Sequence, residues 1–193
     1  LIGEKFIGND NVALILGDNF FYAQSLTKKL KECVKLNRGA TVILHPVRNP
    51  SYYGIASINK RNKITKIIEK PKKKISNLAV TGLYFFDNKV VSYSKKLRPS
   101  KRNELEIVDL LNRYKKNNEL TAQFLGRGAA WLDTGSIKDF YDTSAFVSTL
   151  ENRQGFKIAC LEEIALNNKW INKKNIEIAI KFYGKCNYSQ YLS

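Results

Sequence analysis

The chain has 193 residues, of which 44% are hydrophobic, and a formal net charge of +16 at pH 7. This length is enough for one domain with a sizeable core. No stretch approaches the roughly 20 apolar residues of a membrane span, so we expect no membrane-spanning segment. The sequence starts with Leu1 and contains no Met, from which we expect a fragment, a processed chain or a non-standard start.

The basic composition, with a pI near 9.7, is typical of nucleic-acid-binding proteins. The lysines, however, are scattered through every predicted element, and Lys72–Lys74 is the densest run. We therefore attribute the charge to coding bias and expect no specific nucleic-acid partner, although the positive field should attract phosphorylated substrates. Three widely spaced cysteines support neither a zinc site nor a disulfide framework, and reduced thiols favour a cytoplasmic location.

Strand-like and helix-like segments alternate along the chain, judged by period-2 and helical spacing of apolar residues and by the turn residues between them. In chain order they are a strand at 12–16, a helix at 24–37, a strand at 40–47, a hairpin of 53–59 and 63–69, a central strand at 78–86, helices at 88–97 and 104–117, strands at 120–126 and 129–132, and helices at 137–152, 161–167 and 173–182. Gly39 is placed to end the first helix, and Lys60-Arg61-Asn62 separates the two hairpin strands. The internal Gly82 of the central strand suggests close approach by a ligand or another backbone. This order predicts a mixed, mostly parallel, Rossmann-like α/β sheet flanked by helices over residues 1–154. A small helical C-terminal segment, 155–193, is expected to pack on it.

Two apolar strands end in acidic turns. One runs into Gly17-Asp18-Asn19, and the other runs into Asp133-Thr134-Gly135. Strand carboxyl ends line the ligand crevice of an open α/β sheet, so both aspartates could face one site and hold Mg²⁺ together with phosphate oxygens. Alternatively, each aspartate only caps the helix that follows it. Both interpretations remain open from these two turns alone.

Six motifs occur in an order typical of one family. They are Gly17-Asp18-Asn19, Tyr53-Gly54, Glu69-Lys70-Pro71, Val80-Thr81-Gly82-Leu83-Tyr84, Glu104-Leu105-Glu106-Ile107-Val108-Asp109 and Trp131-Leu132-Asp133-Thr134-Gly135. On these motifs the chain resembles the sugar-1-phosphate nucleotidylyltransferases over essentially its full length. The resemblance implies a nucleotidyltransferase-type sheet and a homotetramer. It also implies Mg²⁺-dependent transfer from dTTP to glucose 1-phosphate, as in dTDP-sugar (rhamnose-type) and cell-surface polysaccharide biosynthesis.

The resemblance implies a role for each matching position. Asp18 and Asp133 would hold Mg²⁺. Lys70 and Arg102 would act catalytically, because their charge offsets the repulsion between two phosphates that meet in line. The substrates would be contacted by Asp18, Tyr53, Gly54, Glu69, Lys70, Val80, Gly82, Tyr84, Arg102 and Trp131.

Within that pocket, Glu69 would accept hydrogen bonds from sugar hydroxyls, and Gly54 would let the backbone approach the sugar. Each position also has a plain structural alternative. Glu69 and Lys70 could be an exposed ion pair, Tyr84 and Trp131 core packing, Gly82 a bulge and Arg102 a solvated charge. Asn103 could be the cap of the helix at 104–117.

The chain departs from the family's pattern at one place. Members begin with a strand and a loop of the form Gly-Gly-x-Gly-Thr-Arg, followed by a lysine, which cradles the nucleotide phosphates. Gly3 and Gly8 do not form such a loop, so we expect this chain to be inactive unless that segment is supplied. Alternatives are a non-catalytic remnant, a sugar-phosphate-binding partner, or a relative that uses another nucleoside triphosphate or sugar phosphate.

Overall fold

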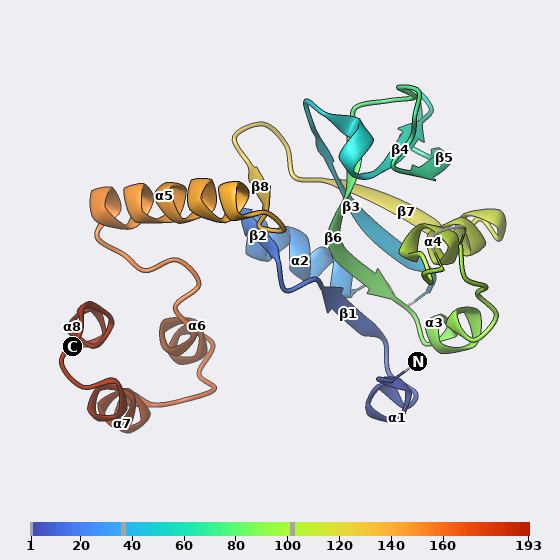
Figure 1. Cartoon of the computed structure of the whole chain (residues 1–193). Coiled ribbons are helices and arrows are strands. Elements are labelled where there is room, and N and C mark those ends of the chain that lie inside the picture. The colour runs from blue at the N-terminus through green and yellow to red at the C-terminus, as the bar shows by residue number, and fades with distance from the viewer. Residues whose placement is uncertain (1, 36–37, 101–102) are drawn as a thin grey trace. The chain divides into compact units, whose positions relative to one another are not determined.

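The structure is a computed structural model that describes residues 2–35, 38–100 and 103–193 (Figure 1). It divides into two compact units, Leu1–Thr134 and Gly135–Ser193. The first unit contains α1 (Glu4–Ile7), β1 (Val12–Ile15), β2 (Asn19–Tyr22), α2 (Leu26–Val34), β3 (Ala40–Pro46), the 3₁₀ turn η1 (Pro50–Tyr52), β4 (Gly54–Ile58), β5 (Ile64–Glu69), β6 (Leu78–Phe86), α3 (Lys89–Ser94), α4 (Ile107–Lys116), β7 (Leu120–Phe124) and β8 (Ala130–Asp133). The second contains α5 (Ile137–Gln154), α6 (Leu161–Asn167), α7 (Lys173–Tyr183) and α8 (Asn187–Leu192).

The main sheet of the first unit has six strands. Five of them follow the order β5-β4-β6-β3-β7, and the sixth, β1, pairs with β6. Strands β2 and β8 form a separate two-stranded sheet. The expected mixed α/β sheet flanked by helices is confirmed, but its expected mostly parallel character is wrong. Among the described strands only β3 and β7 pair in parallel, and the other pairs are antiparallel. The reason is the chain's connections: β4, β5 and β6 follow one another through links without a helix. Parallel neighbours need a longer crossover.

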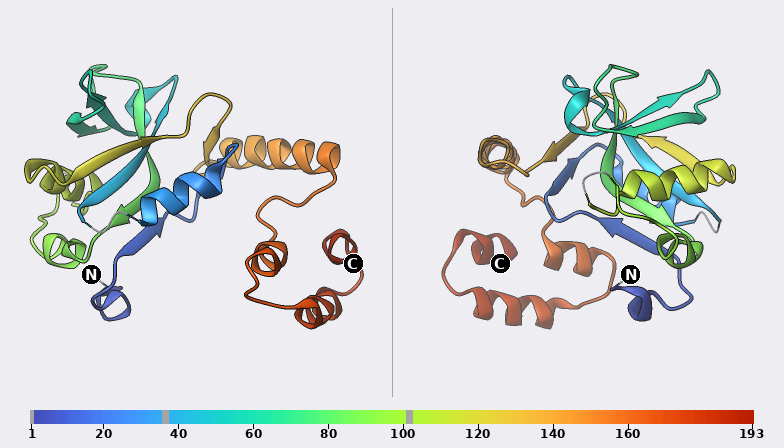
Figure 2. Two further views of the ribbon diagram at one scale, coloured as in Figure 1. Left: turned by 180° about the vertical axis from the view of Figure 1, so that it is seen from behind. Right: turned by 45° about the vertical axis from the view of Figure 1, so that its right-hand side comes forward.

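Strand β6 lies inside this sheet, with β3 on one edge and β1 and β4 on the other (Figure 2). Its alternate side chains enter two hydrophobic clusters. Val80, Tyr84 and Phe86 pack with the buried side chains of α4. Leu83 and Phe85, on the other face, pack with Cys33 of α2. The continuous apolar sequence of this strand is therefore explained by burial on both faces.

Most predicted elements occur within a few residues of their expected bounds, and the differences lie at the ends of helices. The helix expected at 104–117 begins at Ile107, and Glu106, not Asn103, occupies its N-cap position. Asn103 has a left-handed backbone with φ of 60°. The helix expected at 24–37 is described over Leu26–Val34, and residues 36–37 lie outside the described part. Strand β2 and helix α1 were not predicted; each has four residues, and β2 is defined by its pairing with β8.

The second unit begins with α5, whose first turn is capped by Ser136, which accepts a hydrogen bond from the Asp139 amide at 3.1 Å. At the other end of α5, Glu151 accepts from the Ile158 amide at 2.9 Å and pairs with Lys157 at 2.6 Å. These contacts tie the following segment to α5. The structure divides the chain before α5, between Thr134 and Gly135, whereas the expected division at 154/155 lies after this helix. Within the described residues, no helix has both the length and the apolarity to cross a lipid bilayer.

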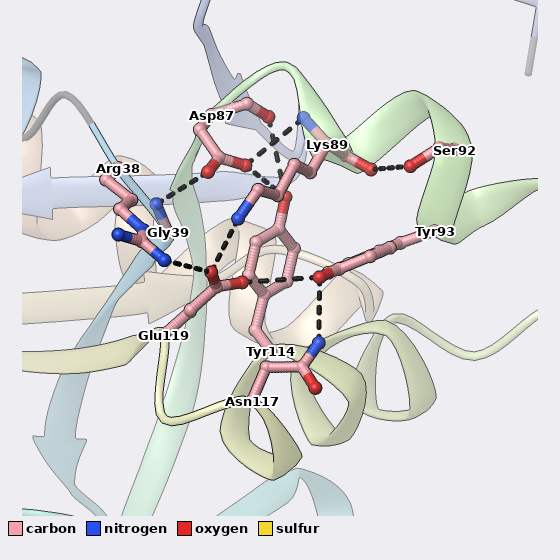
Figure 3. Close-up of polar contacts among 9 residues, drawn as sticks. All are labelled: Arg38, Gly39, Asp87, Lys89, Ser92, Tyr93, Tyr114, Asn117 and Glu119. Carbon is pink, nitrogen blue, oxygen red and sulfur yellow. Dashed lines mark hydrogen bonds and ion pairs between the residues drawn. The ribbon is translucent and has the colours of Figure 1, made fainter.

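A buried carboxylate joins the ends of several elements in the first unit (Figure 3). We call its network the Asp87 cluster; its members are Arg38, Gly39, Asp87, Lys89, Ser92, Tyr93, Tyr114, Asn117 and Glu119. Asp87 accepts hydrogen bonds from the Gly39 amide at 2.7 Å and from the Tyr114 hydroxyl at 2.8 Å. It also accepts from the Lys89 amide at 3.2 Å. The cluster therefore fixes the start of β3 to the end of β6 and to α4.

Gly39 has a position that no other residue can occupy easily. Its φ is +85°, and an added Cβ would lie 2.3 Å from the Glu119 carbonyl oxygen. That carbonyl accepts a hydrogen bond from the Ala40 amide at 2.7 Å. The close approach lets β3 and β7 begin side by side. Gly39, expected to end a helix, is thus required by the sheet.

We predict that Tyr114→Phe lowers the free energy of unfolding by about 1–2 kcal/mol, because the buried Asp87 loses one hydrogen bond. Asp87→Ala should cost about 3 kcal/mol or more, because it leaves the Gly39 amide and the Tyr114 hydroxyl unsatisfied. Urea denaturation measures both. Ser92→Ala, a change at an exposed residue of α3, is the control and should stay within about 0.5 kcal/mol of the parent. An equal effect of all three variants would contradict the structural role of Asp87.

A second prediction concerns acid stability. The hydrogen bond from Lys89, at 2.5 Å, lowers the pKa of the Glu119 carboxyl below its ordinary 4.5. The stability that this carboxylate contributes is then fully present above pH 4.5 and is lost as the pH falls through its depressed pKa. Glu119→Gln should therefore destabilise the chain at pH 7, and the difference from the parent should shrink below pH 4.5 in urea titrations. The exposed Lys138–Asp142 pair offers a control, since Asp142→Asn should change little at either pH.

Candidate functional site

The candidate site lies where one edge of β6 changes its partner. The register with β4 ends at Ala79, and the register with β1 begins at Leu83. Between them, the Gly82 carbonyl accepts from the Leu16 amide at 2.9 Å, just after β1 ends. The Gly82 amide donates to Oδ1 of Asn19 at 3.0 Å. The side-chain oxygen of Asn19 therefore accepts the hydrogen bond that a carbonyl of a neighbouring strand would accept at this point of the β6 edge.

Gly82 is required by its neighbour. An added Cβ would lie 2.5 Å from Cγ and Oδ1 of Asn19, closer than real Cβ contacts allow. The expected close approach at this glycine is made by a side chain. The bulge interpretation is also supported, because β3 advances two residues from Val42 to Leu44 while β6 advances four. The Thr81 hydroxyl donates to the Ile43 carbonyl at 3.0 Å within this irregularity.

The two acidic turns come together at one end of the two-stranded sheet β2–β8. Asn19 is paired with Asp133 in its register, and both the amide and the hydroxyl of Thr134 donate to the Asp18 carbonyl, at 2.7 and 2.9 Å. The helix-cap interpretation is wrong for both aspartates. Asp18 is followed by strand β2, and α5 is capped by Ser136.

Two carboxylates in adjoining turns supply the hard oxygen ligands that suit Mg²⁺. Among the described residues, no group of three or more His, Cys, Asp or Glu side chains is arranged to hold a metal ion. Asp18 and Asp133 alone could therefore fill only part of a coordination shell. The donor set fits a Mg²⁺ ion whose other ligands come from phosphate oxygens and water.

The sugar-binding candidates lie at the end of the β4–β5 pair. Gly54 is paired with Glu69, and an added Cβ on Gly54 would lie 3.0 Å from Oε2 of Glu69 and 3.0 Å from Cγ2 of Val108. The absence of a side chain at Gly54 leaves room for the carboxylate. Val80 lies next to this pair, since its Cβ is 4.0 Å from that same added atom.

Lys70 follows β5 directly and has an uncommon backbone, with φ of 41°. Its amide donates to the Tyr53 carbonyl at 3.0 Å, which closes the chain around the end of the β4–β5 pair. A pocket of 550 Å³ adjoins Glu69 and Lys70 and is lined also by Lys72 and Asp109. Strained backbone of this kind is common at functional sites.

Tyr84 is a core residue, 3% exposed, and its ring stacks on Phe86 with centroids 6.0 Å apart. Burial raises the pKa of its hydroxyl, and the charges of Glu69 and Asp18 raise this pKa further. Tyr84 therefore lies within electrostatic reach of both carboxylates. The core alternative for Tyr84 is confirmed.

Trp131 is 8% exposed and packs against Tyr53, with ring centroids 5.1 Å apart. Its indole Nε1 donates to Oδ1 of Asn19 at 2.6 Å. The packing alternative is thus confirmed for this residue too, but its polar atom is directed to the centre of the candidate site. Arg102, which was expected to contact phosphate, lies outside the described residues.

The structure thus brings Asp18, Gly82 and Trp131 together around Asn19, whereas Gly54, Glu69 and Lys70 gather at the end of β4–β5. Asn19 was not among the predicted site residues. Its place in a Gly-Asp-Asn turn gave no signal that its side chain would reach β6, some sixty positions later in the chain.

The sequence places this chain in a class of nucleotide-transferring proteins. Residues 1–149 match the family described as nucleotidyl transferase. The chain belongs to this family.

Among its relatives are glucose-1-phosphate thymidylyltransferases. One from Neisseria meningitidis is 47% identical over 192 residues, which is 100% of this chain and 67% of the relative. Another, from Xanthomonas campestris, is 42% identical over 193 residues and is covered to 65%. The chain therefore spans about two thirds of the length of these relatives. The resemblance to this enzyme extends over the whole chain.

Solved structures give the same result for the fold. A Bacillus anthracis protein provisionally named glucose-1-phosphate thymidylyltransferase, solved in complex with a sucrose, matches with a TM-score of 0.67 and 40% identity. That match covers 75% of this chain and 57% of the other. A UDP-glucose pyrophosphorylase complexed with UDP-glucose matches with a TM-score of 0.67 and 25% identity, over 76% of this chain and 59% of the other.

On the predicted sugar-binding role of Gly54 and Glu69, Gly54→Ala should weaken glucose 1-phosphate binding about tenfold, the equivalent of about one lost hydrogen bond, because the new methyl group displaces the Glu69 carboxylate. Isothermal titration calorimetry of the chain with glucose 1-phosphate measures the affinity. Gly126→Ala is the control: it also adds a methyl group to a glycine, but nothing lies within 4 Å of its added Cβ. Its left-handed φ of +87° adds backbone strain, so circular dichroism should first establish that both variants are folded. Unchanged affinity in folded Gly54→Ala would contradict the role of the Gly54–Glu69 pair.

Proposed function

We propose that this chain carries the sugar-phosphate-binding and metal-binding part of a Mg²⁺-dependent glucose-1-phosphate thymidylyltransferase. The observation that carries the proposal is the arrangement of the two acidic turns. The Asn19–Asp133 pairing and the Thr134 contacts hold Asp18 and Asp133 in adjoining turns, and Tyr84 lies within electrostatic reach of both Asp18 and Glu69. The identity of the relatives supports dTTP and glucose 1-phosphate as substrates.

The proposed reaction is a single in-line displacement. A phosphate oxygen of glucose 1-phosphate attacks the α-phosphorus of dTTP, and the bond from that phosphorus to the bridging oxygen of the β-phosphate breaks. The products are dTDP-glucose and pyrophosphate, so atoms and charges balance without a covalent intermediate. Positioning and electrostatic stabilisation are sufficient for such a transfer.

In this proposal the residues at the end of β4–β5 hold the sugar phosphate. Glu69 accepts hydrogen bonds from sugar hydroxyls beside the open backbone of Gly54, and Lys70 supplies positive charge to the phosphate. Tyr53 and Trp131, whose rings pack together, are proposed as an aromatic wall near the sugar, and Val80, Gly82 and Tyr84 of β6 as further substrate contacts. Arg102 is proposed as a second phosphate contact.

Asp18 and Asp133 would hold Mg²⁺, which when bound neutralises charge on the phosphate oxygens. The family's Gly-Gly-x-Gly-Thr-Arg loop is absent from the 193-residue sequence. Because such a loop supplies backbone donors to the nucleotide phosphates, we propose that the chain is inactive until a segment carrying it is provided. A cytoplasmic homotetramer engaged in dTDP-sugar and surface-polysaccharide synthesis remains part of the proposal.

A second candidate is the same reaction with UTP. The likeness to a UDP-glucose pyrophosphorylase complexed with UDP-glucose favours it, at lower identity than the thymidylyltransferase relatives. The two candidates share the sugar phosphate and differ only in the nucleotide base. A substrate panel distinguishes them.

The experiment compares the 193-residue chain with a fusion in which a segment bearing the Gly-Gly-x-Gly-Thr-Arg loop precedes Leu1. Pyrophosphate release is measured with glucose 1-phosphate and each of dTTP, UTP, CTP and ATP, with and without Mg²⁺. We expect the fusion to favour dTTP and to require Mg²⁺. The chain alone should be at least about 100-fold slower, since loss of one transition-state donor costs about that factor.

Asp18→Asn in the fusion should abolish most of the activity, whereas Asp142→Asn, the same change at an exposed residue of α5, should not. Preference for UTP would favour the second candidate. Full activity of the chain alone would overturn the need for the loop. A folded fusion that is inactive with all four nucleotides but still binds glucose 1-phosphate would support the sugar-phosphate-binding alternative instead of nucleotidyl transfer.

A further inference from the structure

Both polar atoms of the Asn19 side chain make hydrogen bonds within the candidate site. Its Oδ1 accepts from the Gly82 amide at 3.0 Å and from the indole of Trp131 at 2.6 Å. Its Nδ2 donates to Oδ1 of Asp18 at 2.8 Å. The three partners come from β6, from β8 and from the first acidic turn, which lie far apart in the sequence.

These contacts fix the orientation of the amide. If its oxygen and nitrogen were exchanged, the NH₂ group would face two N–H donors and the oxygen would face a carboxylate. Each exchanged contact would be repulsive. Only the observed orientation satisfies all three partners, so the direction in which Nδ2 points toward Asp18 is determined by Gly82 and Trp131.

The lack of space for a side chain at Gly82 supports this placement of Asn19 independently of the hydrogen bonds. An added Cβ at Gly82 would lie 2.5–2.6 Å from Cγ, Oδ1 and Nδ2 of Asn19. The side chain therefore lies directly on the strand rather than beside it. Gly82 and Asn19 form a matched pair, in which one residue is small because the other occupies its side-chain space.

We propose that Asn19 is the positioning residue of this site, which sets the orientation of the Asp18 carboxylate for the cation. The proposal rests on the proposed function. Because Oδ1 of Asp18 receives a hydrogen bond from Asn19, Oδ2 is the oxygen left to face the cation. Hydrogen-bonding partners that orient a ligating carboxylate commonly change metal affinity by 10- to 100-fold when they are removed.

The first test asks whether the Gly82–Asn19 contact exists, and it does not depend on the proposed function. Gly82→Ala should lower the melting temperature of the chain, because its methyl group overlaps the Asn19 amide. In an Asn19→Ala background the same change should lower it much less, because the overlapping atoms are gone. An equal loss in both backgrounds would overturn the contact.

The second test observes Trp131 directly in Asn19→Ala. The chain has two indole N–H groups, at Trp131 and at Trp170, and Trp170 is 74% exposed. Trp170→Phe assigns the two signals in ¹⁵N spectra. Solvent exchange of the Trp131 indole proton should be at least about tenfold faster in Asn19→Ala, whereas the Trp170 signal should stay unchanged. No change at Trp131 would overturn the role of Asn19 as its acceptor.

The third test connects Asn19 to the cation and uses the active fusion. Asn19→Ala should raise the Mg²⁺ concentration for half-maximal rate by about 10- to 100-fold at saturating glucose 1-phosphate. The same substitution in an Asp18→Asn background should have no further effect on Mn²⁺ binding, measured by electron paramagnetic resonance. Asn152→Ala, at an exposed asparagine of α5, is the matched control.

The outcomes separate the two proposals. If the first two tests succeed and Asn19→Ala leaves the metal requirement unchanged, Asn19 is a structural anchor only, and the positioning role is overturned. If the fusion shows no nucleotidyl transfer at all, the proposed function fails, while Mn²⁺ binding by the parent chain and by Asn19→Ala still decides the positioning role. Equal Mn²⁺ affinity in those two proteins would overturn it.

Discussion

The first unit depends on one strand, β6, which provides backbone hydrogen-bond partners to three other strands. Strand β6 pairs with β3 along one edge and is shared between β1 and β4 along the other. A strand inside a sheet cannot leave backbone groups without partners, because each such group costs free energy when buried. At the transition from β4 to β1 the missing carbonyl is supplied by Asn19. The candidate site is located at the place where ordinary strand pairing is interrupted.

Much of this architecture follows from local sequence. The apolar run at 78–86 predicted a central strand, and Lys60-Arg61-Asn62 predicted the β4–β5 hairpin, both of which the structure contains. Strand order and direction could not be predicted in the same way. They depend on which edges remain unsatisfied once the hairpin has formed, and this is a property of the whole sheet. Strand β2 has only four residues, and it is defined by its pairing with β8 rather than by its own pattern.

The candidate site was predictable in its composition but not in its connections. The ordered motifs identified Asp18, Gly54 and Glu69, and the structure brings the two acidic turns together as expected. The contacts made by Asn19 could not be found from the sequence, because a Gly-Asp-Asn turn is also common where no long-range contact exists. The isolated glycine at Gly82 signalled a close approach, yet the approaching group is specified by a distant part of the chain.

Lys70 combines two properties that usually belong to different residues. Its left-handed backbone would suit glycine better, and its side chain provides the charge beside Glu69. A glycine at this position would relax the backbone and remove the ammonium group in a single step. Under the proposed function, glycine at this position would favour the fold and remove the phosphate contact, whereas lysine keeps that contact at the expense of a less favourable backbone conformation.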